Sequence, residues 1–164
     1  MLVIGGGVFQ VPAIKVAKSM GLKVVVTDYN GDAEGMLMAD YPIEVSTRNI
    51  NLTVNAAKQF HASCPLDGVM TVGTDASQTV AAVANALNLP GIPFEVAERS
   101  TDKIKMRRRL REMGIAVPHF RPVWTIDDLN AAIQEMPLPL VVKPCDNMGA
   151  RGVTMISGPH EAPS

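Results

Sequence analysis

The residue types with the clearest chemical meaning lie late in the chain and suggest phosphate binding. Lys143 ends an apolar run, and the loop that follows it contains Gly149, Arg151 and Gly152. A lysine at the end of a strand supplies a fixed positive charge, and a glycine-containing loop supplies backbone N–H donors. The pattern predicts a flap over the phosphates of a nucleotide, with residues 144–152 mobile when no nucleotide is bound. The alternative is an ordinary hairpin loop with one exposed lysine.

A second basic segment lies forty residues earlier. Six of the nine residues from Lys103 to Arg111 are Lys or Arg. On a helix with 100° per residue, Met106, Leu110 and Met113 form an apolar stripe, and Lys103 borders it. We therefore expect Lys103 to reach a phosphate in a cleft. The residues that point away from the stripe and form a solvated face are Lys105, Arg108 and Arg109.

A third feature, the triple glycine Gly5-Gly6-Gly7, follows the first apolar run. Glycines there let a ligand approach the backbone, and the next helix offers its N-terminal N–H groups to an anion. Asp28 lies 21 residues after Gly7, where a dinucleotide-binding fold places its ribose-binding acid, but Gln10 replaces the third glycine of that fingerprint. A tight turn in a Rossmann-like sheet and an NAD site both remain open.

Strand and helix patterns alternate through the first half of the chain. Apolar runs predict strands at 1–5, 23–28, 41–46 and 68–72, and helical spacing follows the first, third and fourth of them. This alternation predicts an α/β domain over residues 1–95 with an open, parallel, doubly wound sheet. Turns after its strands are the candidate substrate contacts: Gly7, Val8, Phe9, Gln10, Thr74 and Asp75. Residues 73–75 are also expected to cap the helix after the fourth strand.

The pattern changes near residue 89, where LPGIP breaks the alternation. We expect Ser100 or Thr101 to cap the basic helix, and Phe120 to Trp124 to form a strand. Thr125 with Asp128 resembles a capping box in front of a further helix. Strands are expected at 140–143 and 153–156, on either side of the glycine loop.

Composition limits the class of protein. The chain has 164 residues, 47% of them hydrophobic, and a formal net charge of −1. These values indicate a globular chain and argue against nucleic acid or a membrane as partner. Two cysteines are too few for a disulfide framework and favour a cytoplasmic location. The three histidines are too scattered to predict a metal site, and no residue is predicted to be catalytic.

The order of these motifs resembles the ATP-grasp superfamily of carboxylate–amine ligases, which includes carbamoyl-phosphate synthase, biotin carboxylase and purine-synthesis ligases. The resemblance rests on the glycine segment 4–30, Ala39-Asp40, the segment 89–118 with its Asp102-Lys103 pair, and PLVVKPCDNMGARGV at 139–153. It implies a Rossmann-like pre-ATP-grasp domain over 1–95. Residues 96–164 would then be a linker helix and the incomplete beginning of an α+β ATP-grasp domain.

The resemblance also implies a function. In such ligases ATP phosphorylates a carboxylate, and an amine or similar nucleophile attacks the acyl phosphate. The nucleotide-binding residues would be Lys103 and Lys143 with the loop Asp146, Asn147, Met148, Gly149, Ala150, Arg151 and Gly152. Magnesium would accompany ATP, with ligands beyond Ser164, so the chain by itself is expected to be inactive, and a homodimer is compatible with the resemblance. The alternatives are an NAD(P)-binding domain of an oxidoreductase and a non-catalytic nucleotide-binding module.

Overall fold

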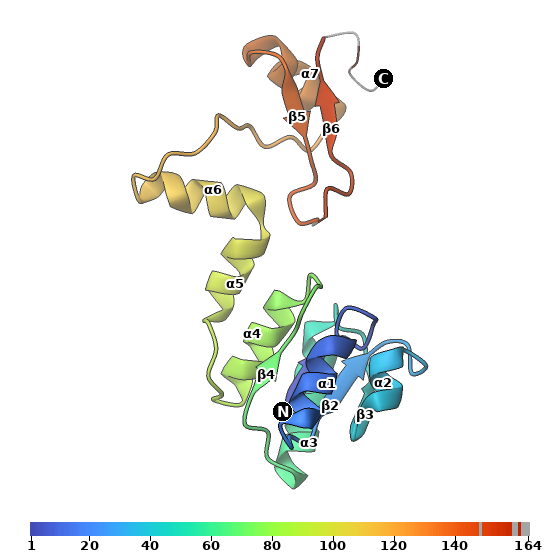
Figure 1. Cartoon of the computed structure of the whole chain (residues 1–164). Coiled ribbons are helices and arrows are strands. Elements are labelled where there is room, and N and C mark those ends of the chain that lie inside the picture. Colours follow the sequence, from blue (N-terminus) through green and yellow to red (C-terminus); the bar gives the residue numbers. More distant parts are fainter. Residues whose placement is uncertain (148, 159–160, 162–164) are drawn as a thin grey trace. The chain divides into compact units, whose positions relative to one another are not determined.

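The structure is a computed structural model that describes residues 1–147, 149–158 and 161 (Figure 1). The chain divides into two compact units, Met1–Glu98 and Arg99–Ser164. Each unit has a hydrophobic core of its own, and each is described separately below.

The first unit contains a four-stranded sheet in the order β3-β2-β1-β4. Its strands are β1 (Leu2–Ile4), β2 (Val25–Asp28), β3 (Tyr41–Glu44) and β4 (Val69–Met70). All three pairings are parallel, with Val3 opposite Val26 in the central pair. The predicted parallel α/β sheet is therefore confirmed. Because the chain runs from β1 through β2 to β3 and then returns to β4, its direction of winding reverses between β1 and β4.

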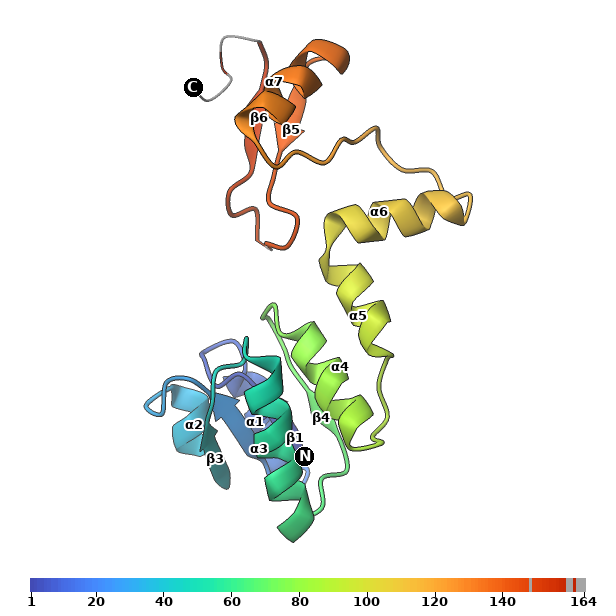
Figure 2. The same cartoon turned by 180° about the vertical axis from the view of Figure 1, so that it is seen from behind.

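Four helices cover the two faces of this sheet: α1 (Val11–Ser19), α2 (Glu34–Met38), α3 (Ile50–Ser63) and α4 (Ser77–Ala86). Leu2 and Ile4 pack with residues of α3 and α4, whereas Val3 packs with residues of α1 and α2. Successive side chains of a strand point to opposite faces, so the buried run of β1 serves both layers. Figure 1 looks onto α1 and Figure 2 onto α3.

Two local features of this unit differ from the predicted pattern. The short helix α2, which the sequence patterns do not indicate, lies between β2 and β3, and in it Gly35 donates its N–H to the Gly6 carbonyl at 2.7 Å. A side chain at Gly35 would place its Cβ 2.7 Å from that oxygen, so glycine permits the close approach. The N-cap residue of helix α4 is Ala76, one residue after the predicted stretch 73–75.

The second unit combines a β-hairpin with helices. Helix α5 (Phe94–Thr101) spans the boundary between the units and is followed by α6 (Lys103–Glu112) and α7 (Ile126–Glu135). Strands β5 (Leu140–Val142) and β6 (Thr154–Ile156) pair antiparallel, with Val141 opposite Met155. Leu129 and Ile133 of α7 pack on Ile156, Leu140 and Val142, which lie on one face of the hairpin.

The starts of α6 and α7 and the segment 120–124 test three local predictions for this unit. The capping box is confirmed: the Asp128 N–H donates to Thr125 Oγ1 and the Thr125 N–H donates to Asp128 Oδ2, both at 3.1 Å. The prediction that Ser100 or Thr101 caps α6 is wrong, because both residues belong to α5 and Asp102 is the cap. Residues 120–124 form no strand; they are an irregular segment in front of Thr125.

Candidate functional site

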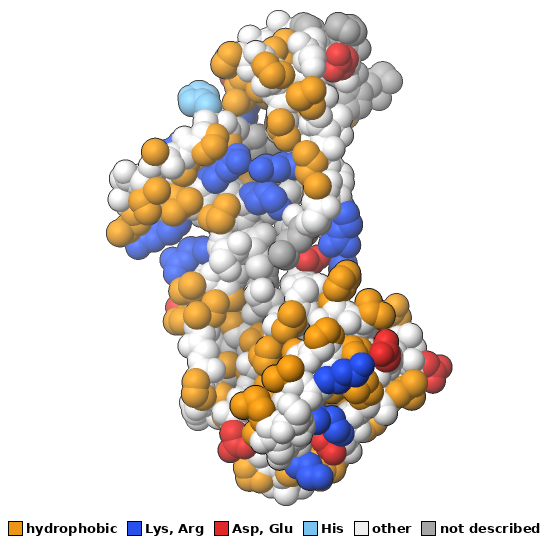
Figure 3. Space-filling view, viewed as in Figure 1, with side chains coloured by type: hydrophobic (Ala, Val, Ile, Leu, Met, Phe, Trp, Pro, Cys, Tyr) orange, Lys and Arg blue, Asp and Glu red, His pale blue; other side chains and the backbone are white. Residues whose placement is uncertain are grey.

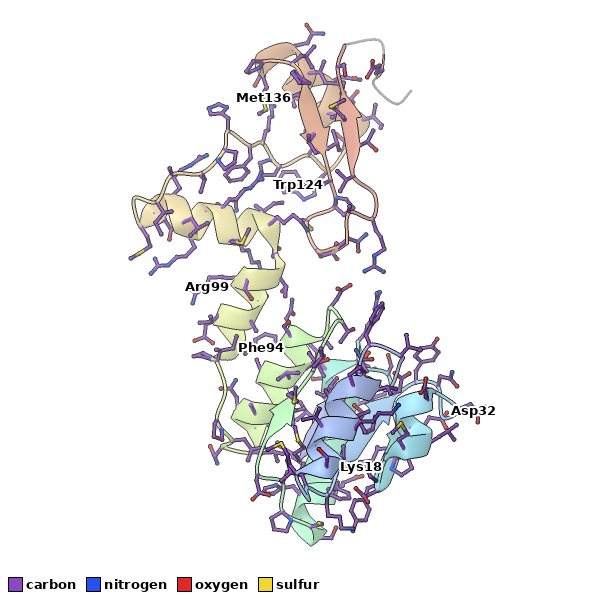
Figure 4. All side chains as sticks on the ribbon, in the orientation of Figure 1. Lys18, Asp32, Phe94, Arg99, Trp124 and Met136 are labelled. Atoms are coloured by element: carbon purple, nitrogen blue, oxygen red, sulfur yellow. The ribbon has the colours of Figure 1, made fainter. Side chains whose placement is uncertain are left out.

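A cavity of about 600 Å³ in the second unit brings the two predicted lysines together. Lys103 lines it from the start of α6, and Lys143 lines it from the residue that follows β5. Apolar side chains cover another part of the wall, among them Phe120, Trp124 and Met136, the last two labelled in Figure 4. The cavity thus combines ammonium groups with an apolar and aromatic wall.

Local structure explains both lysine positions. The Asp102 carboxylate accepts hydrogen bonds from the N–H groups of Ile104 (2.8 Å) and Lys105 (2.9 Å), so α6 begins at Lys103. In β5, Leu140 and Val142 face the core, which leaves Val141 and the following Lys143 on the opposite face. Val141 is 58% exposed there, and it also lines the cavity.

Lys103 contacts the glycine loop directly. Its ammonium nitrogen lies 2.6 Å from the Asn147 carbonyl oxygen and 3.3 Å from the Cys145 carbonyl oxygen. Its backbone N–H donates to the same Cys145 oxygen at 2.9 Å. The first N–H of α6 and the ammonium group, two natural donors for an anion, are thus both engaged with the loop.

The loop itself has the backbone that its glycines permit. Gly149, Ala150 and Gly152 have positive φ angles of 67°, 58° and 71°. Gly152 lies against Pro144, and a Cβ there would be 2.9 Å from the proline Cγ. Asp146, Asn147 and Arg151 are exposed, whereas Met148 lies outside the described residues.

The charged face of α6 follows the prediction, but the predicted apolar stripe is only half-buried at Met106 and Leu110, and Met113 is 60% exposed. Lys105, Arg108 and Arg109 are exposed, and Arg109 pairs with Glu112 at 3.2 Å. Figure 3 shows Lys and Arg side chains along this helix.

The sequence did not predict Arg107 and Phe120 as residues of the cavity wall. The Arg107 and Arg111 guanidinium carbons lie 5.4 and 4.9 Å from the centre of the Phe120 ring, and Arg107 and Phe120 line the cavity. The spacing of two arginines one helical turn apart was visible in the sequence, but their aromatic partner was not.

The candidate substrate residues of the first unit gather at the carboxyl ends of β1 and β4. Gln10 Nε2 donates to the Val72 carbonyl, and Thr71 Oγ1 donates to the Ile4 carbonyl at 2.6 Å. A Cβ at Gly73 would lie 3.0 Å from Phe9 Cβ. The turns that contain Gly7 to Gln10 and Thr74-Asp75 are therefore neighbours at the reversal of winding, where open α/β sheets bind ligands.

The side chains of these candidate substrate residues differ in their exposure to solvent. Val8 and Phe9 are 65% and 71% exposed, whereas Gln10 is only 4% exposed and braces the two turns. Val8 and Phe9 are therefore accessible to a ligand, and Gln10 positions the turns.

The geometry of the glycine turn disfavours a dinucleotide site. Asp28 already accepts hydrogen bonds from the N–H groups of Gly6 (2.8 Å) and Asn30 (3.0 Å). The Gln10 carboxamide lies 3.2–3.3 Å from the positions that Cβ atoms would take at Gly5 and Gly7. The acid that would bind ribose instead holds the turn, and a side chain covers the glycines.

The described residues contain neither a metal-ligand cluster nor a membrane-spanning helix. No three His, Cys, Asp or Glu side chains gather there to hold a metal ion. No helix in that part of the chain is long and apolar enough to cross a membrane.

Comparison with known proteins places the first unit in a family. Residues 14–91 match the model of the ATP-grasp N-terminal domain. The first unit is an ATP-grasp N-terminal domain. The Rossmann-like sheet predicted from the glycine segment is thus the fold of this domain, and the NAD-dependent alternative is not favoured.

Relatives extend the similarity beyond this ATP-grasp N-terminal domain. Alanine–anticapsin ligase of Bacillus subtilis (strain 168) is 32% identical over 98 residues, which are 58% of this chain and 21% of that protein. The crystal structure of L-amino acid ligase from Bacillus licheniformis superimposes with a TM-score of 0.75 at 28% identity, over 98% of this chain and 39% of that one. The ADP complex of N5-carboxyaminoimidazole synthetase from Staphylococcus aureus shares the fold, with a TM-score of 0.74 at 22% identity over 96% of this chain and 41% of that one. The chain therefore corresponds to the N-terminal portion of ATP-grasp ligases and spans well under half of their length.

Proposed function

We propose that this chain is the N-terminal portion of an ATP-dependent ligase that activates a carboxylate as an acyl phosphate for attack by an amine. The proposal rests on one cavity lined by Lys103, Lys143 and the start of the glycine loop at Cys145, with Lys103 also bonded to Asn147 of that loop. The ATP-grasp N-terminal domain and the ligase relatives support it. Because several relatives are named as amino acid ligases, L-amino acids are the first substrates to test.

The residues of the second unit suit the phosphate end of a nucleotide. The ammonium groups of Lys103 and Lys143 offset negative charge on the transferring phosphoryl group, and backbone N–H groups of residues 146–152 add hydrogen bonds. The apolar wall near Trp124 and Val141 suits a planar base. Val8, Phe9, Thr74 and Asp75 of the first unit are proposed to contact the carboxylate or amine substrate.

Three further parts of the proposal rest on the resemblance to the family alone. Magnesium would supply positive charge beside the phosphates, and the described residues provide no ligand cluster for it. A homodimer is part of the proposal, as is a cytoplasmic location, which suits the two free, exposed cysteines.

The test replaces the lysines one at a time in the natural protein that contains this chain. Charge-assisted hydrogen bonds are worth about 1.5–3 kcal/mol, so Lys143→Met and Lys103→Met should each weaken ATP binding about tenfold or more. Binding is measured by calorimetric titration, and ligase activity by ADP release with pairs of L-amino acids.

Lys105→Met and Arg109→Met are the matched controls, because both residues lie on the exposed face of the same helix. They should bind ATP nearly as wild type does. Equal losses from all four variants would show that only overall charge matters, and the two-lysine site would be wrong.

A further inference from the structure

The contact between Lys103 and the glycine loop has the properties of a latch. Three hydrogen bonds converge on two loop carbonyls: the Lys103 ammonium donates to Asn147 and Cys145, and the Lys103 N–H donates to Cys145. In sequence the partners are 42 and 44 residues apart, so the contact closes a long segment of the second unit on itself. Lys103 thus holds a loop that composition alone predicts to be mobile.

The loop carbonyls occupy the groups that an anion would need. The ammonium has three N–H donors, and two of them point to carbonyl oxygens. The first N–H of a helix is a further anion-binding donor, and it too is satisfied by Cys145. The third ammonium N–H stays open, but a phosphate oxygen can take the other two and the helix N–H only by replacing the loop carbonyls.

Lys143 provides the contrast within the same cavity. No hydrogen bond or ion pair joins its side chain to any residue that the structure describes, and it is exposed. One lysine of the pair is thus open to a ligand, while the other is engaged with the loop.

We infer that Lys103 is an autoinhibitory latch, which holds the glycine loop through the Cys145 and Asn147 carbonyls until an anionic ligand takes over its donors. The inference rests on the proposed nucleotide site for its meaning, because the displaced carbonyls would yield to the phosphates of that nucleotide. It adds a conformational step to binding: the loop is released as the phosphate is bound.

Trypsin provides a local probe of the loop. Arg151 is the single Lys or Arg among residues 144–152, and the bond after Lys143 resists trypsin because proline follows. Cleavage after Arg151 in the full chain, without nucleotide, therefore reports release of the loop. Its rate is divided by the rate of cleavage after Arg108 in α6, which corrects for opening of the whole unit.

Lys103→Met keeps the helix propensity of α6 while removing the ammonium. We expect the corrected rate after Arg151 to rise about fivefold in this variant, since exposed charge-assisted hydrogen bonds are worth a modest amount. Lys143→Met and Lys105→Met should keep the wild-type rate. Mass spectrometry of the fragments over time gives the rates.

Two results would overturn the latch. One is a ratio of cleavage after Arg151 to cleavage after Arg108 that is the same in Lys103→Met as in wild type. This includes the case in which cleavage at both sites becomes faster by the same factor. The other is a rise of similar size in Lys143→Met. Because the assay contains no nucleotide, failure of the latch is separate from failure of the ATP-binding proposal, in which both lysine variants lose affinity.

Discussion

At the scale of single residues, Thr27 is the exception in the core of the first unit. Its side chain is fully buried in β2, and its hydroxyl has no hydrogen-bond partner among the residues that the structure describes. Two other buried threonines, Thr53 and Thr79, donate to backbone carbonyls at 3.0 and 2.7 Å. A buried polar group without a partner costs free energy of folding, whereas a satisfied one does not.

Thr27→Val is therefore expected to stabilise the protein by about 1 kcal/mol, since valine has the same shape without the unsatisfied hydroxyl. The free energy of unfolding is measured by urea titration followed by circular dichroism. Thr53→Val is the matched control: it should destabilise the protein by about 1 kcal/mol, because it leaves the Ser46 carbonyl without its donor. A destabilised Thr27→Val would mean that this hydroxyl finds a partner in solution.

At the scale of elements, the capping box makes the stability of helix α7 depend on pH. The pKa of Asp128 is held below its usual value, chiefly by the Trp124 N–H, which donates to Oδ2 at 3.1 Å, and then by the Thr125 hydroxyl. A carboxyl whose pKa is lower in the folded than in the unfolded state stabilises the fold above the unfolded pKa. That contribution is lost as pH falls through the folded pKa.

Asp128→Asn should therefore lower the free energy of unfolding at pH 7, and its difference from wild type should shrink as pH falls below about 4. Urea unfolding of both proteins at pH 7 and pH 3 gives the two differences, with the fluorescence of Trp124 as a probe beside the box. Asp127→Asn changes the neighbouring acid in the first turn of α7 but keeps the box, so it should show little such pH dependence. A difference of the same size at both pH values would contradict a role for the ionised carboxylate.

At the scale of the whole molecule, the two units differ in the size of their cores. The first unit buries apolar side chains on both faces of a four-stranded sheet, whereas the buried cluster of the second consists of Leu129, Ile133 and Ile156. Buried apolar contacts set the free energy of local opening. The second unit should therefore open more easily than the first.

We expect the amides of β5, β6 and α7 to lose protection from hydrogen exchange at a lower urea concentration than those of β1 and β2. Hydrogen exchange followed by mass spectrometry resolves the peptides of each unit. A single common midpoint for both sets of amides would show that the units unfold together.

The sequence by itself determined the features that depend on neighbouring residues. The apolar runs predict β1 and β2, and the alternation of strands and helices predicts a parallel sheet, because connections between parallel strands must cross over. The Thr125–Asp128 box is also local, and its partners are three residues apart. Short-range patterns did not indicate α2, in which Gly35 contacts Gly6. The predicted cap of α6 is wrong because α5 continues through Thr101.

Only the tertiary structure decided which groups meet. Spacing along the chain predicts that Lys103 and Lys143 each suit a phosphate, but not that Lys103 binds the Asn147 carbonyl 44 residues away. Nor does it show that Asp28 and Gln10 occupy the glycine turn that the spacing offers to NAD. The physical reason is that a side chain's partner depends on the packing of distant segments, whereas periodicity reports only which face of its own element a residue occupies.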